Sequence, residues 1–203
     1  MHFNEMLQSV TDFLMLHPEK TVLMEVSKEY TSLKNTRTFE KTFISYKNHS
    51  DYQSFWWSHS YLPTLGQARG KIVLLKRFSK SFAVSGSINV TNWQDNTEFN
   101  LADSRHVKIH AQNDYKVKVS TNADKWQSIK TNINTAAKHT NVLYLNFTSG
   151  YTPILGIPNI RKVSGSINPK LINYFSNQSK NKKTHGVIIS DFTTQSLIKS
   201  ELQ

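Results

Sequence analysis

Three polar residues directly follow hydrophobic segments that we expect to be strands, and they are the first candidates for chemistry. Asp191 follows Gly186–Ser190, Arg77 follows the run Ile72–Leu75, and Glu29 follows a third such segment. In barrels of parallel strands, catalytic groups collect at the C-terminal strand ends. We therefore expect these side chains to face one common mouth.

Each of the three residues also has an ordinary structural interpretation. Asp191 is equally suited to cap a helix that begins near Thr193, because Asp is a favoured N-cap residue. Arg77 is equally well explained as a surface charge where the chain leaves its strand, and Glu29 as an exposed carboxylate.

The sequence contains none of the common nucleotide, zincin or serine-hydrolase motifs, GxxxxGK[ST], GxGxxG, HExxH and GxSxG. Zero cysteines exclude disulfides, a cysteine-zinc site and a thiol nucleophile. His106 and His110 are four apart, but their segment predicts a strand or loop, so the two rings do not share a helical face. We expect solvated histidines there, with no metal site and no cofactor.

Hydrophobic spacing predicts that helices and strands alternate along the chain. Helices are expected over Phe3–Leu14, Phe39–Ile44, Asn122–Lys138, from Pro169 with Asn168 as N-cap, and over Leu197–Leu202. Strands are expected over Thr21–Val26, Gly70–Phe78, Val142–Phe147 and Gly186–Phe192. The polar stretch Ser79–Thr121 offers only weak strands at Val107–Ile109 and Val117–Val119. This alternation is typical of a parallel α/β sheet or barrel.

Composition and charge indicate which class of partner the protein binds. The 203 residues include 25 Lys and Arg against 14 Asp and Glu, giving a net charge of +11 and predicting an anionic partner. The basic residues are dispersed and Lys180–Lys183 is typical of a solvated turn, so we expect no nucleic-acid binding. The first fifteen residues predict no signal peptide, and no apolar run approaches the roughly 18 residues of a membrane span.

Two apolar segments could lie either in the core or at the surface. Trp56 and Trp57 are best explained as part of a core cluster. The loop from Tyr151 to Pro158 is a membrane-contact candidate, since exposed apolar residues on a cationic protein suit anionic lipid. Packing of this loop against the next helix is the alternative. Its candidate contact residues are Tyr151, Ile154, Leu155 and Ile157.

Several segments, read in order, resemble bacterial phosphatidylinositol-specific phospholipase C. The matching stretches are FLMLHPEKTVLMEVSKEY (13–30), LGQARGKIVLLKRF (65–78), AQNDYKV (111–117), LYLNFTS (143–149), SINPKLINYF (166–175) and GVIISDF (186–192). They keep their order and approximate spacing across essentially the whole chain, and the GKIVLLKRF block is the most specific.

The resemblance implies an incomplete, distorted (βα) TIM-type barrel that lacks its first strands, with residues 1–203 forming a single domain. It implies a secreted, metal-independent enzyme that cleaves phosphatidylinositol at the membrane surface to diacylglycerol and a cyclic inositol phosphate. In the family a histidine base, a histidine acid and an arginine carry the reaction. All three belong to the N-terminal part that this chain is expected to lack. His2 is followed by Phe3 where the family has Gly, so it receives no role, and we expect the chain alone to be inactive.

The remaining roles transfer residue by residue. Asp191 matches the carboxylate that orients the absent base, and Tyr115 matches the aromatic on which the inositol ring lies. Substrate binding is also assigned to Glu29, Arg77 and Asn113. Two positions depart from the family. Asn113 stands where an acid is usual, with Asp114 displaced by one, and Ser27 stands where a lysine is often found.

A second interpretation, from another functional class, needs no catalysis. A cationic module would bind anionic membrane surfaces through its net charge and the loop from Tyr151 to Pro158. In both interpretations we expect the folded chain to be a monomer.

Overall fold

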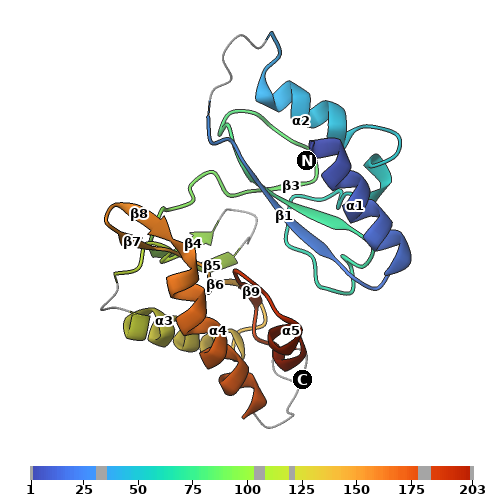
Figure 1. The fold of residues 1–203 in the computed structure, drawn as a ribbon. Helices are drawn as coiled ribbons and strands as arrows, with labels where there is room; N and C mark the ends of the chain where they lie inside the picture. Colours follow the sequence, from blue (N-terminus) through green and yellow to red (C-terminus); the bar gives the residue numbers. More distant parts are fainter. Residues whose placement is uncertain (1, 31–35, 103–107, 119–121, 178–183, 202–203) are drawn as a thin grey trace. The chain divides into compact units, whose positions relative to one another are not determined.

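A computed structural model describes residues 2–30, 36–102, 108–118, 122–177 and 184–201 (Figure 1). Contacts divide these residues into two compact units, one ending at Trp93 and one beginning at Gln94. Both units combine helices with a sheet, so the predicted mixed α/β class is confirmed. Among the described residues, no helix has both the length and the hydrophobicity that a membrane crossing requires.

The first unit contains a parallel sheet of order β1-β2-β3, formed by Val22–Ser27, Ile72–Arg77 and Ser87–Asn89. Its helices are α1 (Phe3–Leu16), α2 (Phe39–Lys47) and the 3-10 turn η1 (Gln53–Phe55). The central strand β2 is buried from Ile72 to Lys76, which explains its continuous apolar run. Helix α1 buries Leu7, Thr11 and Leu14 along one stripe, whereas Phe13 is exposed.

The second unit contains a four-stranded sheet of order β4-β5-β6-β9, formed by Glu98–Ala102, Lys108–Gln112, Leu143–Phe147 and Val187–Ile189. Strands β5, β6 and β9 are parallel to one another, and β4 is antiparallel to β5. A small hairpin, β7 (Thr152–Ile154) and β8 (Ile157–Asn159), follows β6.

Three helices complete the second unit: α3 (Asn122–Ala136), α4 (Ile160–Ser176) and α5 (Gln195–Glu201). Helix α4 packs against both of the others, and Figure 1 shows α3 and α4 side by side. Their apolar faces form one core, which comprises Val117, Ile129, Ile133, Val163, Ile167, Leu171, Phe175 and Leu197. Helix packing therefore supports the sheet that carries Asp191.

Two predictions about these elements are wrong. Asn168 and Pro169 do not begin α4; they lie inside it, and Asn159 is the N-cap, its side chain accepting a hydrogen bond from Lys162 N at 2.9 Å. The helix starts earlier because its buried stripe recurs every four residues, from Val163 to Phe175. This stripe outweighs the cost of an internal proline.

The polar stretch Ser79–Thr121 holds more strand than predicted. It contains β3, β4 and β5, and the antiparallel β4 departs from the purely parallel arrangement. Their polar, partly exposed residues gave no hydrophobic period. Residues Val117 and Lys118 form no strand, although Lys116 makes one bridge to Tyr151. The predicted core positions of Trp56 and Trp57 are confirmed by their burial.

Gly186 directly precedes β9 and determines the backbone conformation at the start of this strand. Its φ is +73°, and a Cβ there would lie 2.6 Å from the backbone oxygen of Tyr144. Gly186→Ala is expected to lower the free energy of unfolding by more than about 1 kcal/mol, because the left-handed conformation alone costs that much. Urea denaturation measures the change.

The matched control is Gly165→Ala in the interior of α4, where an added Cβ meets no atom within 4 Å. This variant is expected to gain roughly 0.5–1 kcal/mol of helix stability. Equal effects of the two substitutions would contradict the proposed backbone clash.

Candidate functional site

The C-terminal ends of β5, β6 and β9 lie at one edge of the second unit's sheet, because these strands are parallel. Three loops follow at this edge: Asn113–Lys116 after β5, Thr148–Tyr151 after β6, and Ser190–Phe192 after β9. Strand β4 runs the other way, so its preceding segment, Gln94–Thr97, reaches the same edge. We call this edge the carboxyl rim.

Asp191 lies half-buried on the carboxyl rim. Its Oδ2 accepts a hydrogen bond from Gly150 N at 3.3 Å, and its backbone oxygen accepts one from Asn168 Nδ2 at 2.9 Å. Helix α5 is capped instead by Thr194, whose Oγ1 accepts from Leu197 N. The N-cap alternative for Asp191 is therefore wrong.

Tyr115 lies beside Asp191's loop through Gly150 and Tyr151. Tyr151 N donates to the backbone oxygen of Tyr115 at 2.7 Å, and a Cβ on Gly150 would lie 2.6 Å from that same oxygen. The Tyr115 hydroxyl donates to Asp95 Oδ2 at 2.7 Å. Gly150 thus contacts both candidate residues, one through its amide and one through its missing side chain.

Asn113 and Asp114 occupy different surroundings. The buried Asn113 donates from Nδ2 to Gln94 O at 3.3 Å. The half-buried Asp114 accepts from Gln112 Nε2 at Oδ2, also at 3.3 Å. The charged group after β5 is therefore supplied by Asp114, close to the ammonium of Lys125.

Lys125 was missed by sequence reasoning. It lies in the first turn of α3, is only 4% exposed, and donates from Nζ to the backbone oxygens of Asp114 (2.6 Å) and Phe147 (2.5 Å). Burial lowers the pKa of Lys125 to about 8, and the carboxylates of Asp114 and Asp191 oppose that shift. The signal was a lysine on the face of α3 that also carries Ile129 and Ile133.

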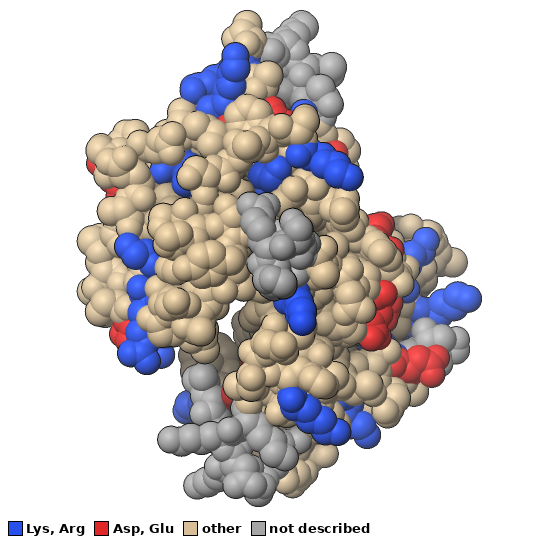
Figure 2. All heavy atoms as spheres, turned by 180° about the vertical axis from the view of Figure 1, so that it is seen from behind, with Lys and Arg blue, Asp and Glu red and all other residues tan. Residues whose placement is uncertain are grey.

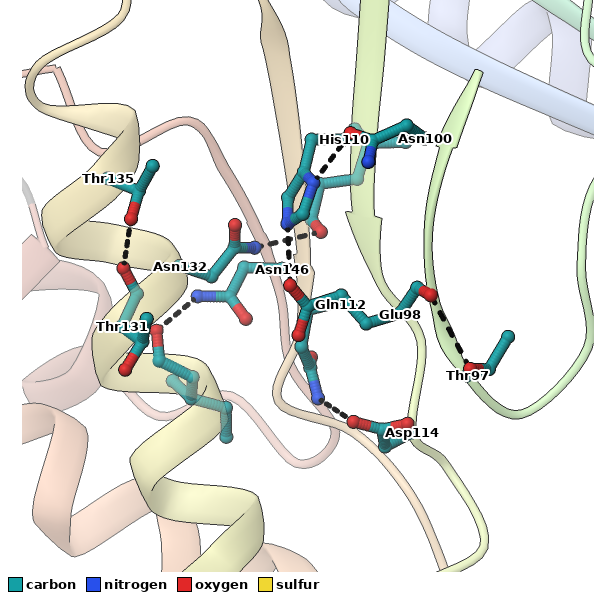
Figure 3. A network of polar contacts seen from close by, with 12 residues as sticks. Thr97, Glu98, Asn100, His110, Gln112, Asp114, Thr131, Asn132, Thr135 and Asn146 are labelled. Atoms are coloured by element: carbon teal, nitrogen blue, oxygen red, sulfur yellow. Dashed lines mark hydrogen bonds and ion pairs between the residues drawn. The ribbon is translucent and has the colours of Figure 1, made fainter.

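Buried amides join α3 to the sheet behind the carboxyl rim (Figure 3). Asn146 Nδ2 donates to Ile129 O at 3.0 Å, and Asn132 Nδ2 donates to Leu145 O at 3.2 Å. Gln112, fully buried, is the register partner of Asn146 and reaches on to Asp114. These hydrogen bonds fix the position of α3 along the strands, and therefore the position of Lys125.

His110 belongs to the far end of the same network and is not a solvated loop residue. Its Nε2 lies 3.2 Å from Glu98 Oε1 and its Nδ1 lies 2.9 Å from Asn100 Oδ1 (Figure 3). That expectation was wrong because β4 pairs with β5 and brings its polar side chains alongside. His106 lies outside the described residues, within which no cluster of His, Asp and Glu could hold a metal ion.

Arg77 and Glu29 lie in the first unit. Arg77 Nη1 is 3.8 Å from Glu25 Oε1, and its guanidinium lies over the Trp93 ring at 5.2 Å. Ser27 Oγ donates to Glu29 Oε1 at 3.0 Å. Desolvation raises the pKa of Glu25, Arg77 opposes the shift, and Glu29 adds to it.

A cavity of about 410 Å³ opens beside Glu25. It lies between α1, α2 and β1 and is lined mainly by Phe, Met, Val and Tyr side chains. Arg77 is thus a paired, partly buried cation, and its surface-charge alternative is wrong. Glu29 is exposed, as its alternative stated.

The β7–β8 hairpin projects apolar side chains from the second unit. Leu155 is 98% exposed, Ile157 71% and Ile154 40%. Packing against the next helix is therefore wrong for Leu155 and Ile157. Tyr151 differs from these residues, because it is half-buried and its ring lies 6.0 Å from that of Tyr115. Basic side chains on the face in Figure 2 are scattered among neutral ones.

No protein-family model matches the chain. Two curated relatives from Staphylococcus aureus, both named 1-phosphatidylinositol phosphodiesterase, are 27% identical to it over 187 residues. The match covers 89% of this chain but only 59% and 56% of those relatives, so the chain spans well under two thirds of their length.

Several solved structures have a fold similar to that of this chain. A phosphatidylinositol-specific phospholipase C from Staphylococcus aureus matches 98% of this chain and 70% of its own, with a TM-score of 0.78 and 24% identity. The corresponding enzyme from Listeria monocytogenes matches 97% and 68%, with a TM-score of 0.72 and 22% identity. The resemblance inferred from the sequence is confirmed.

The lowered pKa of Lys125 predicts an unusual pH dependence of the free energy of unfolding. Between pH 8 and about 10.5 the unfolded chain holds a proton on this lysine that the folded chain has released, so the free energy of unfolding rises with pH by up to about 3 kcal/mol. Below pH 8 both states are protonated and this contribution stays constant.

Denaturation of the wild type and of Lys125→Met across this pH range isolates the effect, since other titrating groups are common to both proteins. The difference between their unfolding free energies is expected to grow in favour of the wild type. A constant difference would contradict the lowered pKa.

Proposed function

We propose, from the similarity of this chain to bacterial phosphatidylinositol-specific phospholipases C, that it provides part of such an enzyme. The substrate is phosphatidylinositol, and the products are diacylglycerol and a cyclic inositol phosphate. The observation that carries the proposal is the meeting of Asp191 and Tyr115 at Gly150. These are the two residues to which the resemblance assigns base orientation and inositol stacking.

The roles follow from the contacts. Asp191 Oδ2 accepts from Gly150 N, and Oδ1 is the atom proposed to receive a histidine. The hydrogen bond of Tyr115 to Asp95 fixes the edge of a ring that would support inositol. Asp114 takes the acidic role in place of Asn113, whose amide is bound to Gln94. A carboxylate hydrogen-bonds sugar hydroxyls more strongly than an amide does.

Arg77 and Glu29 complete the proposed inositol site. Their positions at the C-terminal ends of β2 and β1 support this assignment, as does the partner Glu25, which holds the guanidinium. The resemblance also supports an incomplete (βα) TIM-type barrel and a single domain over residues 1–203. The proposal also includes secretion, since the action proposed is at an external membrane surface.

The 203-residue chain is expected to show no measurable turnover by itself. None of its histidines matches the general base or acid, and each such group contributes about 10²- to 10⁴-fold to the rate. Incubation with phosphatidylinositol vesicles, followed by assay of cyclic inositol phosphate, measures this. A rate near that of the intact Staphylococcus aureus enzyme would refute the expected inactivity.

A second candidate function, binding of an anionic membrane without catalysis, is favoured by the β7–β8 hairpin. Its tip exposes Leu155 almost completely and Ile157 to a large extent. Nearby, the half-exposed Phe192 lies under the guanidinium of Arg161, 5.2 Å from its ring centre. An apolar tip with adjacent cations suits insertion between anionic headgroups.

Leu155→Ser is expected to weaken binding to vesicles of phosphatidylglycerol and phosphatidylcholine by about tenfold or more, since burying a leucine side chain is worth roughly 1.5–3 kcal/mol. Vesicle sedimentation measures the affinity. Leu65→Ser, at an exposed position of the first unit, is the matched control and should change nothing. Equal losses in both variants would argue against insertion of the hairpin.

A further inference from the structure

Lys125 is a buried charged side chain beside the carboxyl rim that no assigned role uses. It is almost fully buried, and its ammonium binds two backbone oxygens from two different loops. Asp114 O belongs to the loop after β5, and Phe147 O ends β6. One side chain from α3 therefore joins two loops that are otherwise far apart in sequence.

Packing alone does not demand a charge at this position. The same face of α3 carries Ile129 and Ile133, both completely buried, and an apolar side chain would continue that face at lower desolvation cost. Two carbonyls and the nearby carboxylates of Asp114 and Asp191 offset the burial. The ammonium donates to two carbonyls, which an apolar side chain at this position cannot do.

The two carbonyls lie next to the residues that matter at the carboxyl rim. Asp114 immediately precedes Tyr115, and Phe147 precedes the turn that contains Gly150. That turn is closed by Thr148, whose N donates to Ile189 O at 2.9 Å and whose Oγ1 lies 2.7 Å from Ser190 Oγ. Gly150 then reaches both Tyr115 and Asp191.

We propose that Lys125 is a positioning residue: by binding Asp114 O and Phe147 O it sets the spacing at which Gly150 holds Tyr115 and Asp191 together. This inference rests on the proposed function for its consequence, which is binding of an inositol headgroup. It does not rest on that function for its geometry. Removal of the ammonium is expected to loosen both loops, because each carbonyl loses the hydrogen bond from Nζ.

The test compares Lys125→Met with Lys130→Met, which removes a half-buried positive charge from the same helix. Amide NMR signals and hydrogen exchange of Gly150 and Tyr151 are the geometric readout. Lys125→Met is expected to shift both signals and to accelerate their exchange at least tenfold relative to the amides of the α4 core. Lys130→Met is expected to leave them unchanged. Unaltered Gly150 and Tyr151 amides in Lys125→Met would overturn the proposal.

Headgroup binding separates this inference from the proposed function. The probes are vesicles containing phosphatidylinositol and vesicles containing the same fraction of phosphatidylglycerol. Wild type that prefers phosphatidylinositol, with the preference reduced about tenfold or more in Lys125→Met only, supports both. Wild type with no preference counts against the proposed function, and the amide readout then decides on Lys125 alone.

A titration of the wild type covers the case in which Lys125→Met does not fold. Loss of the proton from Lys125 near pH 8 changes the charge beside both carbonyls. The Gly150 and Tyr151 amide shifts are then expected to titrate with that midpoint, ahead of amides on α4. The titration therefore extends from pH 7 to pH 11, and shifts that stay flat over this whole range would exclude the positioning role.

Discussion

The ammonium of Lys125, buried between two carbonyl oxygens, is the interaction on which the carboxyl rim depends. A buried backbone carbonyl at the end of a parallel strand needs a donor. At this edge, one side chain from α3 supplies Asp114 O and Phe147 O together. The loops that carry Tyr115 and Gly150 are consequently held by a helix and not only by their own turns.

This arrangement works only if α3 cannot slide along the sheet. The reciprocal amides provide that restraint: Asn146 donates to a carbonyl of α3 and Asn132 donates to a carbonyl of β6. Directional hydrogen bonds fix the axial position, whereas the apolar contacts of Ile129 and Ile133 tolerate small shifts. Packing supplies much of the stability, and the amides supply the register.

The proposed headgroup site and the proposed membrane contact lie in the same unit but differ in how their side chains are exposed. At the carboxyl rim, polar groups are held by hydrogen bonds from Lys125 Nζ and Gly150 N, which restrict the geometry before any ligand arrives. The β7–β8 hairpin instead leaves Leu155 and Ile157 exposed, which is the basis of the proposed membrane contact. Tyr151 joins the two, since it begins the hairpin and binds the backbone of Tyr115.

The sequence by itself determined the elements with strong hydrophobic periods, among them α1, β2 and α3, as well as the α/β class and the position of Asp191 after its strand. It misplaced the start of α4, because a local Asn-Pro signal competed with a longer buried stripe. It also left β4 unassigned, since polar residues that pair across an edge carry no period of their own. Tertiary structure alone decided that Asp114 and not Asn113 lies near Lys125, and that Lys125 is buried. Those outcomes depend on how a helix is seated on a sheet, which long-range hydrogen bonds establish and local residue spacing does not encode.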